Sequence, residues 1–330
     1  MAELLRALSL FSGCGGFDWG AQRAGLQIIW ANDINPHAAA AYRSIFPDVE
    51  FVHDDIRNIS TFPAAEVLIG CYPCTGYSIA ARRRWKDSPT RDLQANETNF
   101  LYWQFLRVLG QVKPRFAFIE NVGGMVSADN GFFLEQQEFH FRRLGYEAEY
   151  ARLSAADYGA PQARERVFIV LTSRAMRPFK YRFPEPTHGP ERDLPYRVLR
   201  DAIGHMEEWP RGEFNEKPFH GHYLTRNRKR GWEQPSFTIV AHEDHVPLHP
   251  AGEPMRNIGK DAWELQGEIN RRLSWRECVA IQGLPETIAP TGTLKRRYEV
   301  VGNAVPPAFG EALLRPIIDA DPQPRIIRVR

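Results

Sequence analysis

The stretch that decides the fold is Leu8-Ser9-Leu10-Phe11-Ser12-Gly13-Cys14-Gly15-Gly16-Phe17. It predicts a buried strand, a glycine-rich turn and the start of a helix. Glycines at such a turn let the backbone approach a ligand closely. A dinucleotide fingerprint would require glycine at position 18, where this chain has Asp18. The turn therefore predicts a ligand without a diphosphate, and the alternative is a tight turn with a purely structural role.

Outward from this turn, short apolar runs alternate with helix-like segments. We expect strands at 6–11, 22–31, 50–53, 67–71, 116–120 and 167–172, and helices at 35–46, 99–112, 273–282 and 304–318. This alternation predicts an α/β fold with a doubly wound, Rossmann-like parallel sheet. Ligands of such sheets bind beyond the carboxyl ends of the strands.

The composition changes near Ser173, where prolines become frequent and periodicity is lost. We therefore expect a larger domain formed by 1–172 and 290–330. A smaller, irregular domain is expected at 173–289, together with its adjoining helix.

Two carboxylates follow predicted strands at useful distances from the glycine turn. Asp33 follows the second strand, at the spacing of an acidic residue that binds a ribose hydroxyl pair. Asp55 follows the third strand and could accept a hydrogen bond from an adenine amino group. Together with the turn, these residues favour a ligand that contains adenosine.

Cys74 follows the fourth predicted strand, in Gly70-Cys71-Tyr72-Pro73-Cys74-Thr75-Gly76. The pair Cys71 and Cys74 has the spacing of a thiol–disulfide motif, but a loop-like stretch follows where that motif would open a helix. Zinc would require a second ligand pair, and neither Cys14 nor Cys278 has one nearby. A nucleophilic Cys74 remains, against the alternative of a buried structural cysteine.

Cys74 is accompanied by other chemically active side chains. Glu120 ends another predicted strand, and Arg164 and Arg166 lie at period two just before a further one. A thiol, a carboxyl group and paired guanidiniums at one sheet edge form a plausible catalytic group.

At this point the sequence resembles the cytosine-5 DNA methyltransferase family, over most of the chain apart from the irregular domain. Six motifs agree in order and spacing: Phe11-Ser12-Gly13-Cys14-Gly15-Gly16, Pro73-Cys74, Glu120-Asn121-Val122, Gln162-x-Arg164-x-Arg166, Arg271-x-Leu273-Ser274-x-Arg276-Glu277 with Gln282-Gly283-Leu284-Pro285, and Gly302-Asn303-Ala304-Val305-Pro306-Pro307. The family usually has Gln where this chain has Thr75, and often Gln where it has Val300. These departures leave the proposed nucleophile, acid and arginines intact.

The resemblance implies a class I methyltransferase sheet, S-adenosylmethionine as methyl donor and S-adenosylhomocysteine as product. It implies that Cys74 attacks carbon 6 of cytosine as the thiolate. A protonated Glu120 then holds ring nitrogen 3 and the exocyclic amine, Arg164 fixes the cytosine carbonyl, and Arg166 orients Glu120. The cofactor contacts it implies are Leu10, Phe11, Gly13, Gly15, Gly16, Phe17, Asp33, Ile34, Asp55, Ile56, Pro73, Leu101, Asn303, Ala304 and Val305. No metal ligands are expected.

The implied substrate is double-stranded DNA from which the target base is flipped out, because the faces of a stacked base are covered. The segment 78–96 is our candidate for a loop that closes over the base, and the irregular domain is expected to recognise the sequence. The expected DNA contacts are Ser78, Arg82, Arg83, Arg84, Arg226, Arg228 and Thr238.

The amino-acid composition limits the class of protein to which the chain can belong and the partners that it can have. The net charge is +2, and 35 of the 42 basic residues are arginine, which suits phosphates and base edges but is also typical of a GC-rich genome. Four cysteines in 330 residues argue against a disulfide scaffold. No apolar run is long enough for a membrane span, and the first residues lack a signal peptide pattern. We expect a monomeric, cytoplasmic, nucleoid-associated protein of a bacterium or archaeon, with no membrane partner.

Three other functions remain open. The chain could be an RNA cytosine methyltransferase that acts on transfer RNA, a non-catalytic DNA-binding regulator on the same scaffold, or a redox protein that uses Cys71 and Cys74. For a DNA enzyme, a restriction–modification system with a cognate endonuclease and a phage-defence system are both expected settings.

Overall fold

A seven-stranded sheet forms the centre of the larger lobe in the computed structural model, which describes residues 4–73 and 101–320. Its strands run in the order β3-β2-β1-β4-β5-β8-β6. Their bounds are β1 Arg6–Leu10, β2 Gln27–Asp33, β3 Glu50–His53, β4 Val67–Gly70, β5 Phe116–Asn121, β6 Tyr146–Ser154 and β8 Glu165–Ser173. Strands β1 to β5 pair in parallel, and β8 is antiparallel to both β5 and β6. The predicted doubly wound α/β class is confirmed, and all six expected strands are present.

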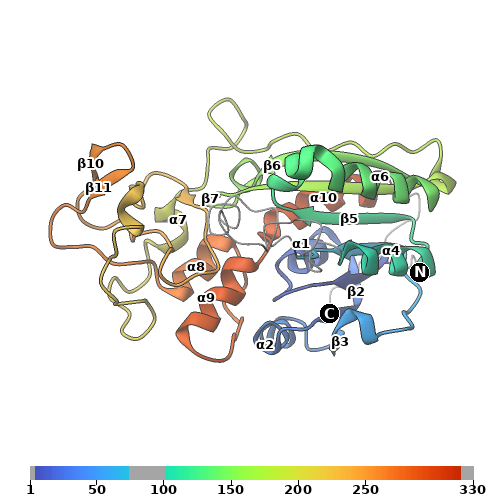
Figure 1. Cartoon of the computed structure of the whole chain (residues 1–330), viewed down its shortest axis with the longest axis horizontal. Coiled ribbons are helices and arrows are strands. Elements are labelled where there is room, and N and C mark those ends of the chain that lie inside the picture. Colours follow the sequence, from blue (N-terminus) through green and yellow to red (C-terminus); the bar gives the residue numbers. More distant parts are fainter. Residues whose placement is uncertain (1–3, 74–100, 321–330) are drawn as a thin grey trace.

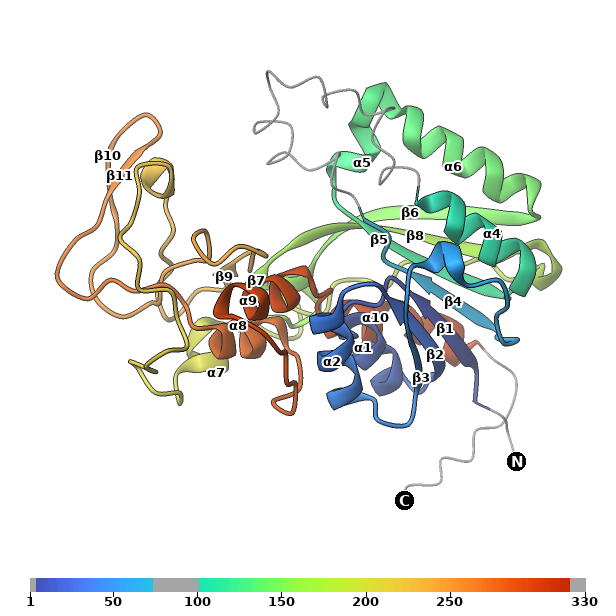
Figure 2. The same ribbon diagram turned by 60° about the horizontal axis from the view of Figure 1, so that its bottom comes forward.

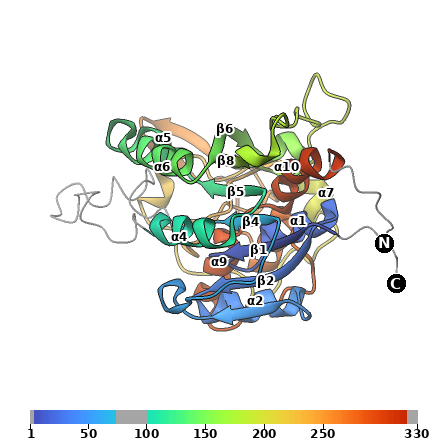
Figure 3. The ribbon, with the colours of Figure 1, turned by 90° about the vertical axis from the view of Figure 1, so that its right-hand side faces the viewer.

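Helices cover both faces of this sheet (Figure 3). One face packs on α1 (Gly16–Ala24) and α10 (Pro307–Asp319), and the other on α4 (Tyr102–Val112) and α6 (Phe132–Arg143). Helix α2 (Pro36–Ile45) lies beside β2 and β3, and the short α5 (Gly124–Ser127) precedes α6. Alternate side chains of β5 and β8 enter opposite cores, as expected for a sheet buried on both faces.

The smaller lobe extends away from the sheet and has few regular elements (Figure 1). It contains α7 (Leu199–Ile203), β9 (Ser236–Phe237) and the hairpin of β10 (Arg256–Gly259) and β11 (Ala262–Glu264). Strand β9 pairs in parallel with β7 (Gln162–Ala163), which comes from the chain of the larger lobe.

Helices α8 (Trp275–Gln282) and α9 (Leu294–Asn303) lie between the two lobes (Figure 2). Helix α8 begins with a capping box, in which Ser274 and Glu277 satisfy each other's backbone N–H groups. The apolar core around α8 and α9 also includes Ala38 and Ala41 of α2. The lobes therefore share buried packing.

Among the described residues, no helix is both long and apolar enough to cross a membrane.

Candidate active site

The register of the sheet places the predicted site residues along one edge. The paired rows are Leu10 with Asn32, Leu10 with Gly70, and Gly70 with Ile119. The next residues along these strands are therefore Asp33, Phe11, Cys71 and Glu120. Neighbouring strands are about 4.8 Å apart. The glycine turn, the chain leading to Cys74 and Glu120 thus lie side by side at the carboxyl edge, as the sequence predicted.

The three glycines of the turn have different physical reasons to be glycine. Gly13 has a φ of +56°, and a Cβ there would meet no atom of the described residues within 4 Å, so this part of the turn is open on their side. A Cβ on Gly15 would lie 2.4 Å from the Phe46 ring, and one on Gly16 would lie 2.2 Å from the Val305 carbonyl oxygen. Gly13 is consequently the glycine that leaves room for a ligand, whereas Gly15 and Gly16 allow close packing.

Asp33 ties the turn to the start of α2. Its Oδ2 accepts from the Gly13 N–H at 2.8 Å, and its Oδ1 accepts from the Asn35 N–H at 2.8 Å. Burial raises the pKa of Asp33, although these backbone donors oppose the rise. The next residue, Ile34, leaves 64% of its surface exposed. A carboxylate held by backbone donors beside an exposed apolar side chain suits a ribose and the face of an adenine ring.

The other expected cofactor contacts fall into two groups. Leu10, Phe17 and Ile56 are buried in the apolar cores, so their side chains are unavailable and only their backbone could meet a ligand. Three further side chains are at least partly accessible, namely Pro73, Leu101 and Asn303.

Asp55 is hydrogen-bonded through its carboxylate to the side chain of Arg57. Its carboxylate accepts from the Arg57 Nε, at 3.0 and 3.1 Å, and from the Arg57 Nη2 at 2.6 Å. These bonds lower the pKa of Asp55. Any contact with an adenine amino group would use the remaining lone pairs.

The C-terminal motif returns to the glycine turn. Ala304 and Val305 are buried, and the Val305 carbonyl lies against Gly16. Further along, a Cβ on Gly20 would lie 1.9 Å from the Pro307 carbonyl oxygen. Helices α1 and α10 are therefore in backbone contact, and the contact between Val305 and Gly16 brings the C-terminal motif to the turn.

Glu120 and Arg166 form an ion pair at the sheet edge. The Arg166 Nε lies 2.8 Å from the Glu120 Oε1, and the two side chains are only 16% and 13% exposed. The Arg166 Nη1 also donates to the Glu165 carbonyl at 2.7 Å. Arg166 is thus held in a position where it fixes one carboxylate oxygen of Glu120.

Arg164 differs from the expectation. Its side chain is 2% exposed, and its Nη1 donates to the carbonyls of Ile239 at 2.8 Å and Gly302 at 3.2 Å. The break between β7 and β8 falls at Arg164, so the period-two argument that put both arginines on one face does not hold here. Arg164 joins the smaller lobe to the end of α9, and Arg166 is the arginine beside Glu120.

Two buried glutamines that we did not predict complete this junction. Both side chains are fully buried, and the Gln162 Nε2 donates to the Gln282 Oε1 at 2.6 Å. Gln162 also accepts from the Ile239 N–H at 3.2 Å, and Gln282 donates to the Val301 carbonyl at 2.7 Å. Gln162 and Gln282 both lie inside motifs of the family, but only the charged residues of those motifs were predicted to have a role.

Cys74, Ser78, Arg82, Arg83 and Arg84 lie outside the described residues. The chain that leads to Cys74 is described as far as Pro73. Tyr72 is buried, its hydroxyl donates to Gln137 of α6, and its ring packs edge-on against Phe11 at 6.4 Å. Gln137 was not predicted, because nothing in the sequence links a helix position to this strand end.

The Cys71 thiol is poorly suited to redox chemistry. Burial raises its pKa well above the usual range, and the nearby charge of Glu120 adds to this. A thiol that resists ionisation is a weak nucleophile, which disfavours a function based on Cys71 and Cys74.

The three expected DNA contacts in the smaller lobe differ in how far their side chains are exposed to solvent. Arg226 is exposed. Arg228 is 6% exposed, and it donates to the carbonyls of Tyr223 and His245, both at 3.1 Å. Arg228 therefore stabilises the lobe from inside, and the expectation that it reaches DNA is not supported. Thr238 donates to the Ala163 carbonyl at 2.9 Å, which places it beside the arginine motif.

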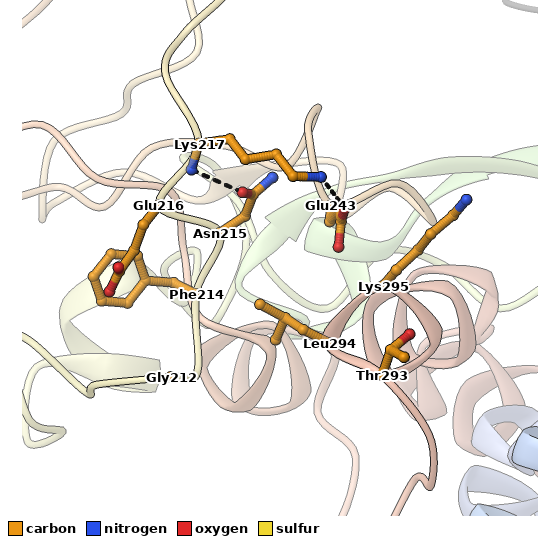
Figure 4. Close-up of a pocket in the computed structure, with 9 residues that line it drawn as sticks. All are labelled: Gly212, Phe214, Asn215, Glu216, Lys217, Glu243, Thr293, Leu294 and Lys295. Atoms are coloured by element: carbon orange, nitrogen blue, oxygen red, sulfur yellow. Dashed lines mark hydrogen bonds and ion pairs between the residues drawn. The ribbon is translucent and has the colours of Figure 1, made fainter.

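A pocket of about 510 Å³ lies elsewhere, between the smaller lobe and the first turn of α9 (Figure 4). It is lined by Gly212, Phe214, Asn215, Glu216, Lys217, Glu243, Thr293, Leu294 and Lys295. Its charges largely cancel, and Lys217 is paired with Glu243 at 2.8 Å. None of these residues belongs to the predicted site. Within residues 4–73 and 101–320, no group of three or more metal-ligating side chains is present.

Comparison with known proteins agrees with this geometry. The family described as C-5 cytosine-specific DNA methylase matches residues 5–319. The Type II methyltransferase M.BsuRI of Bacillus subtilis is 36% identical over 357 residues, which cover 96% of this chain and 79% of the relative. M.BspRI of Lysinibacillus sphaericus is 36% identical over 358 residues, covering 96% and 82%. The solved structure of the methyltransferase EhMeth of Entamoeba histolytica has 18% identity and a TM-score of 0.65, with 96% and 98% of the chains covered, and it supports the fold alone. The chain belongs to the C-5 cytosine-specific DNA methylase family.

Proposed function

We propose that this protein methylates carbon 5 of cytosine in a specific duplex DNA sequence, with Cys74 as covalent nucleophile. The observation that carries this assignment is the Arg166–Glu120 ion pair, which lies in one row with the glycine turn and the strand leading to Cys74. The relatives named as Type II methyltransferases favour DNA over RNA as substrate.

The donor set at the glycine turn fits S-adenosylmethionine. Asp33 would hold the ribose hydroxyls, Ile34 the face of the adenine, Asp55 its amino group, and the open turn at Gly13 the amino-acid portion. None of these contacts involves a diphosphate, which agrees with the presence of Asp18 where the dinucleotide fingerprint requires its third glycine. S-adenosylmethionine supplies an electrophilic methyl group when bound.

The protein's own side chains then make cytosine reactive. The Cys74 thiolate forms a bond to carbon 6, and the electron pair of the 5,6 double bond makes carbon 5 nucleophilic. Glu120, fixed through Oε1 by Arg166, acts in its protonated form: it donates a proton to ring nitrogen 3 as the thiolate adds, and it accepts from the exocyclic amine. Once carbon 5 carries the methyl group, the carbon 5 proton passes to water, the carbon–sulfur bond breaks and the thiolate leaves with its electron pair. Ring nitrogen 3 returns its proton to Glu120.

The two arginines divide the remaining work. Arg164 is committed to two backbone carbonyls, so it acts as a positioning residue at the lobe junction. Arg166 is left to hold Glu120 and to contact the cytosine carbonyl. In this proposal Arg166 keeps the role on Glu120 that the resemblance implied, and it takes over the contact with the cytosine carbonyl from Arg164.

We assign residues 173–289 to target recognition, and 1–172 with 290–330 to catalysis and cofactor binding. Arg226 and Thr238 in the smaller lobe, and Ser78 with Arg82 to Arg84 in the segment that follows Cys74, are the DNA contacts of this proposal. A monomer acting beside a cognate restriction endonuclease is the setting that the Type II relatives favour.

Incubation with labelled S-adenosylmethionine and either mixed-sequence DNA or transfer RNA tests the function. We expect label in DNA alone, and base-resolution sequencing should place 5-methylcytosine at one short motif. Label in transfer RNA alone, or no label in either, would overturn the proposal.

A further inference from the structure

The basic cluster 226–230 divides into residues that face inward and residues that remain available. Arg228 is held by two carbonyls, and burial lowers its pKa to about 10. Lys229 is 5% exposed, and its Nζ donates to the Ile269 carbonyl at 3.1 Å. Only Arg226 and Arg230 of the four basic side chains are left for a partner.

Within the described part of the chain, Arg230 is positioned by its contact with an aromatic ring. Its guanidinium carbon lies 4.2 Å from the centroid of the Phe237 ring, the shortest of the cation–ring contacts found in the described residues. Across residues 4–73 and 101–320, no carboxylate pairs with Arg230, and its buried Nε has no hydrogen-bond partner. Stacking fixes the plane of a guanidinium and leaves its donors along the edge, which is the arrangement for bidentate recognition.

Phe237 lies close to the catalytic groups. It pairs with Ala163 in the β7–β9 ladder, and the adjacent Thr238 is bonded to the same residue. Arg166 follows Ala163 by three positions in a chain that turns at Ala163, where the Arg164 N–H donates to the Gln162 carbonyl at 3.0 Å. The two residues are therefore at most about 10 Å apart, at roughly 3.3 Å per residue. Stacked base pairs are about 3.4 Å apart, so this span corresponds to about three base pairs. Both strands of the ladder lie at the junction of the two lobes (Figure 2).

Resting on the function proposed above, we infer that Arg230 is a specificity-determining residue that reads a guanine within about three base pairs of the target cytosine. A planar guanidinium recognises the guanine O6 and N7 acceptors through two hydrogen bonds. Phe237 is the positioning residue that holds this fork in place before DNA arrives. Arg226 is exposed and stacks on no aromatic ring of residues 4–73 and 101–320, so it contacts phosphate instead.

The test compares Arg230→Ala with the wild type on the methylated motif and on duplexes that carry each single base-pair change. The wild type must first methylate its motif, so a failure of the proposed function is seen before any variant is examined. We expect Arg230→Ala to lose about 10- to 100-fold in kcat/KM on the native motif. At one G·C position, discrimination should fall by the same factor, while other positions keep theirs. Arg174→Ala, which removes an exposed arginine at the opposite edge of the sheet, should match the wild type.

Two variants keep the test decisive if Arg230→Ala fails to fold. Arg230→Lys keeps the charge and removes the fork, so it should show the same relaxed position. Phe237→Leu keeps Arg230 and removes its platform, so the loss should be smaller but at the same position. A uniform loss over all sequences, with a weaker dependence on salt, would mean a phosphate contact and would overturn the inference. Unchanged discrimination in Arg230→Lys would overturn it as well.

Discussion

Replacing Asp18 by asparagine should remove about 1.4 kcal/mol of the pH dependence of folding stability between about pH 5 and pH 7.5. Asp18 lies in the first turn of α1 and is 1% exposed. Its two oxygens accept from the Ser9 hydroxyl and the Tyr42 hydroxyl, both at 2.8 Å. Burial raises its pKa from 3.8 to about 6, and the two hydroxyl donors offset part of the rise.

The magnitude follows from linkage. Because the pKa is higher in the folded chain, the folded state binds this proton more tightly than the unfolded state. The resulting stabilisation is complete below about pH 4 and is lost as the pH rises through about 6. A shift of about two pKa units corresponds to about 3 kcal/mol in total. Between about pH 5 and pH 7.5 the loss is about 1.4 kcal/mol.

Urea unfolding of both proteins at several pH values measures this difference. The free energy of unfolding of Asp18→Asn, relative to the wild type, should rise by about 1.4 kcal/mol from about pH 5 to pH 7.5. Asp48→Asn, which changes an exposed aspartate, controls for the loss of one charge. If the pH profiles of Asp18→Asn and the wild type are parallel, the carboxylate is not the buried acid described here.

Three further changes test other contacts. Gly16→Ala should lower the free energy of unfolding by about 1–3 kcal/mol, because the new Cβ meets the Val305 carbonyl at 2.2 Å. Calorimetry should also show weaker binding of S-adenosylhomocysteine. Unchanged stability would show that the turn is not tightly packed. Gln137→Leu removes the acceptor of the Tyr72 hydroxyl. A double-mutant cycle with Tyr72→Phe should give a coupling free energy of unfolding of about 1 kcal/mol. Additive effects of the two substitutions would refute this contact. Arg166→Ala should lower the single-turnover methylation rate about 100-fold with DNA affinity retained, and a normal rate would exclude its role on Glu120.

The sheet could be predicted where apolar runs were continuous. The strands from 67 and 116 are buried on both faces, so they lack alternation and stand out as short apolar segments. β6 was missed because it lies at the sheet edge and carries charged side chains on partly or fully exposed positions, namely Glu147, Glu149 and Arg152. Helix α9 was missed because Lys295, Arg296 and Arg297 obscure its apolar side.

The site was predictable to the level of the strand end, but not to the level of side-chain direction. Ligands of parallel α/β sheets bind beyond the carboxyl ends of the strands, so the carboxyl edge could be named before the structure was known. The burial of Arg164 and Arg228 depends on which backbone carbonyls the irregular lobe brings near, and no periodicity encodes that. The stacking of Arg230 on Phe237 joins an irregular segment to a strand of two residues, and no periodicity in the sequence indicates that contact.

A covalent complex with DNA that carries 5-fluorocytosine at the target position tests the nucleophile most directly. Fluorine at carbon 5 cannot leave as a proton does, so the carbon–sulfur bond should persist after methyl transfer. We predict an adduct that resists denaturant, with the nucleotide located on Cys74 by peptide mass spectrometry. Absence of the adduct in the wild type, or its persistence in Cys74→Ser, would contradict the account.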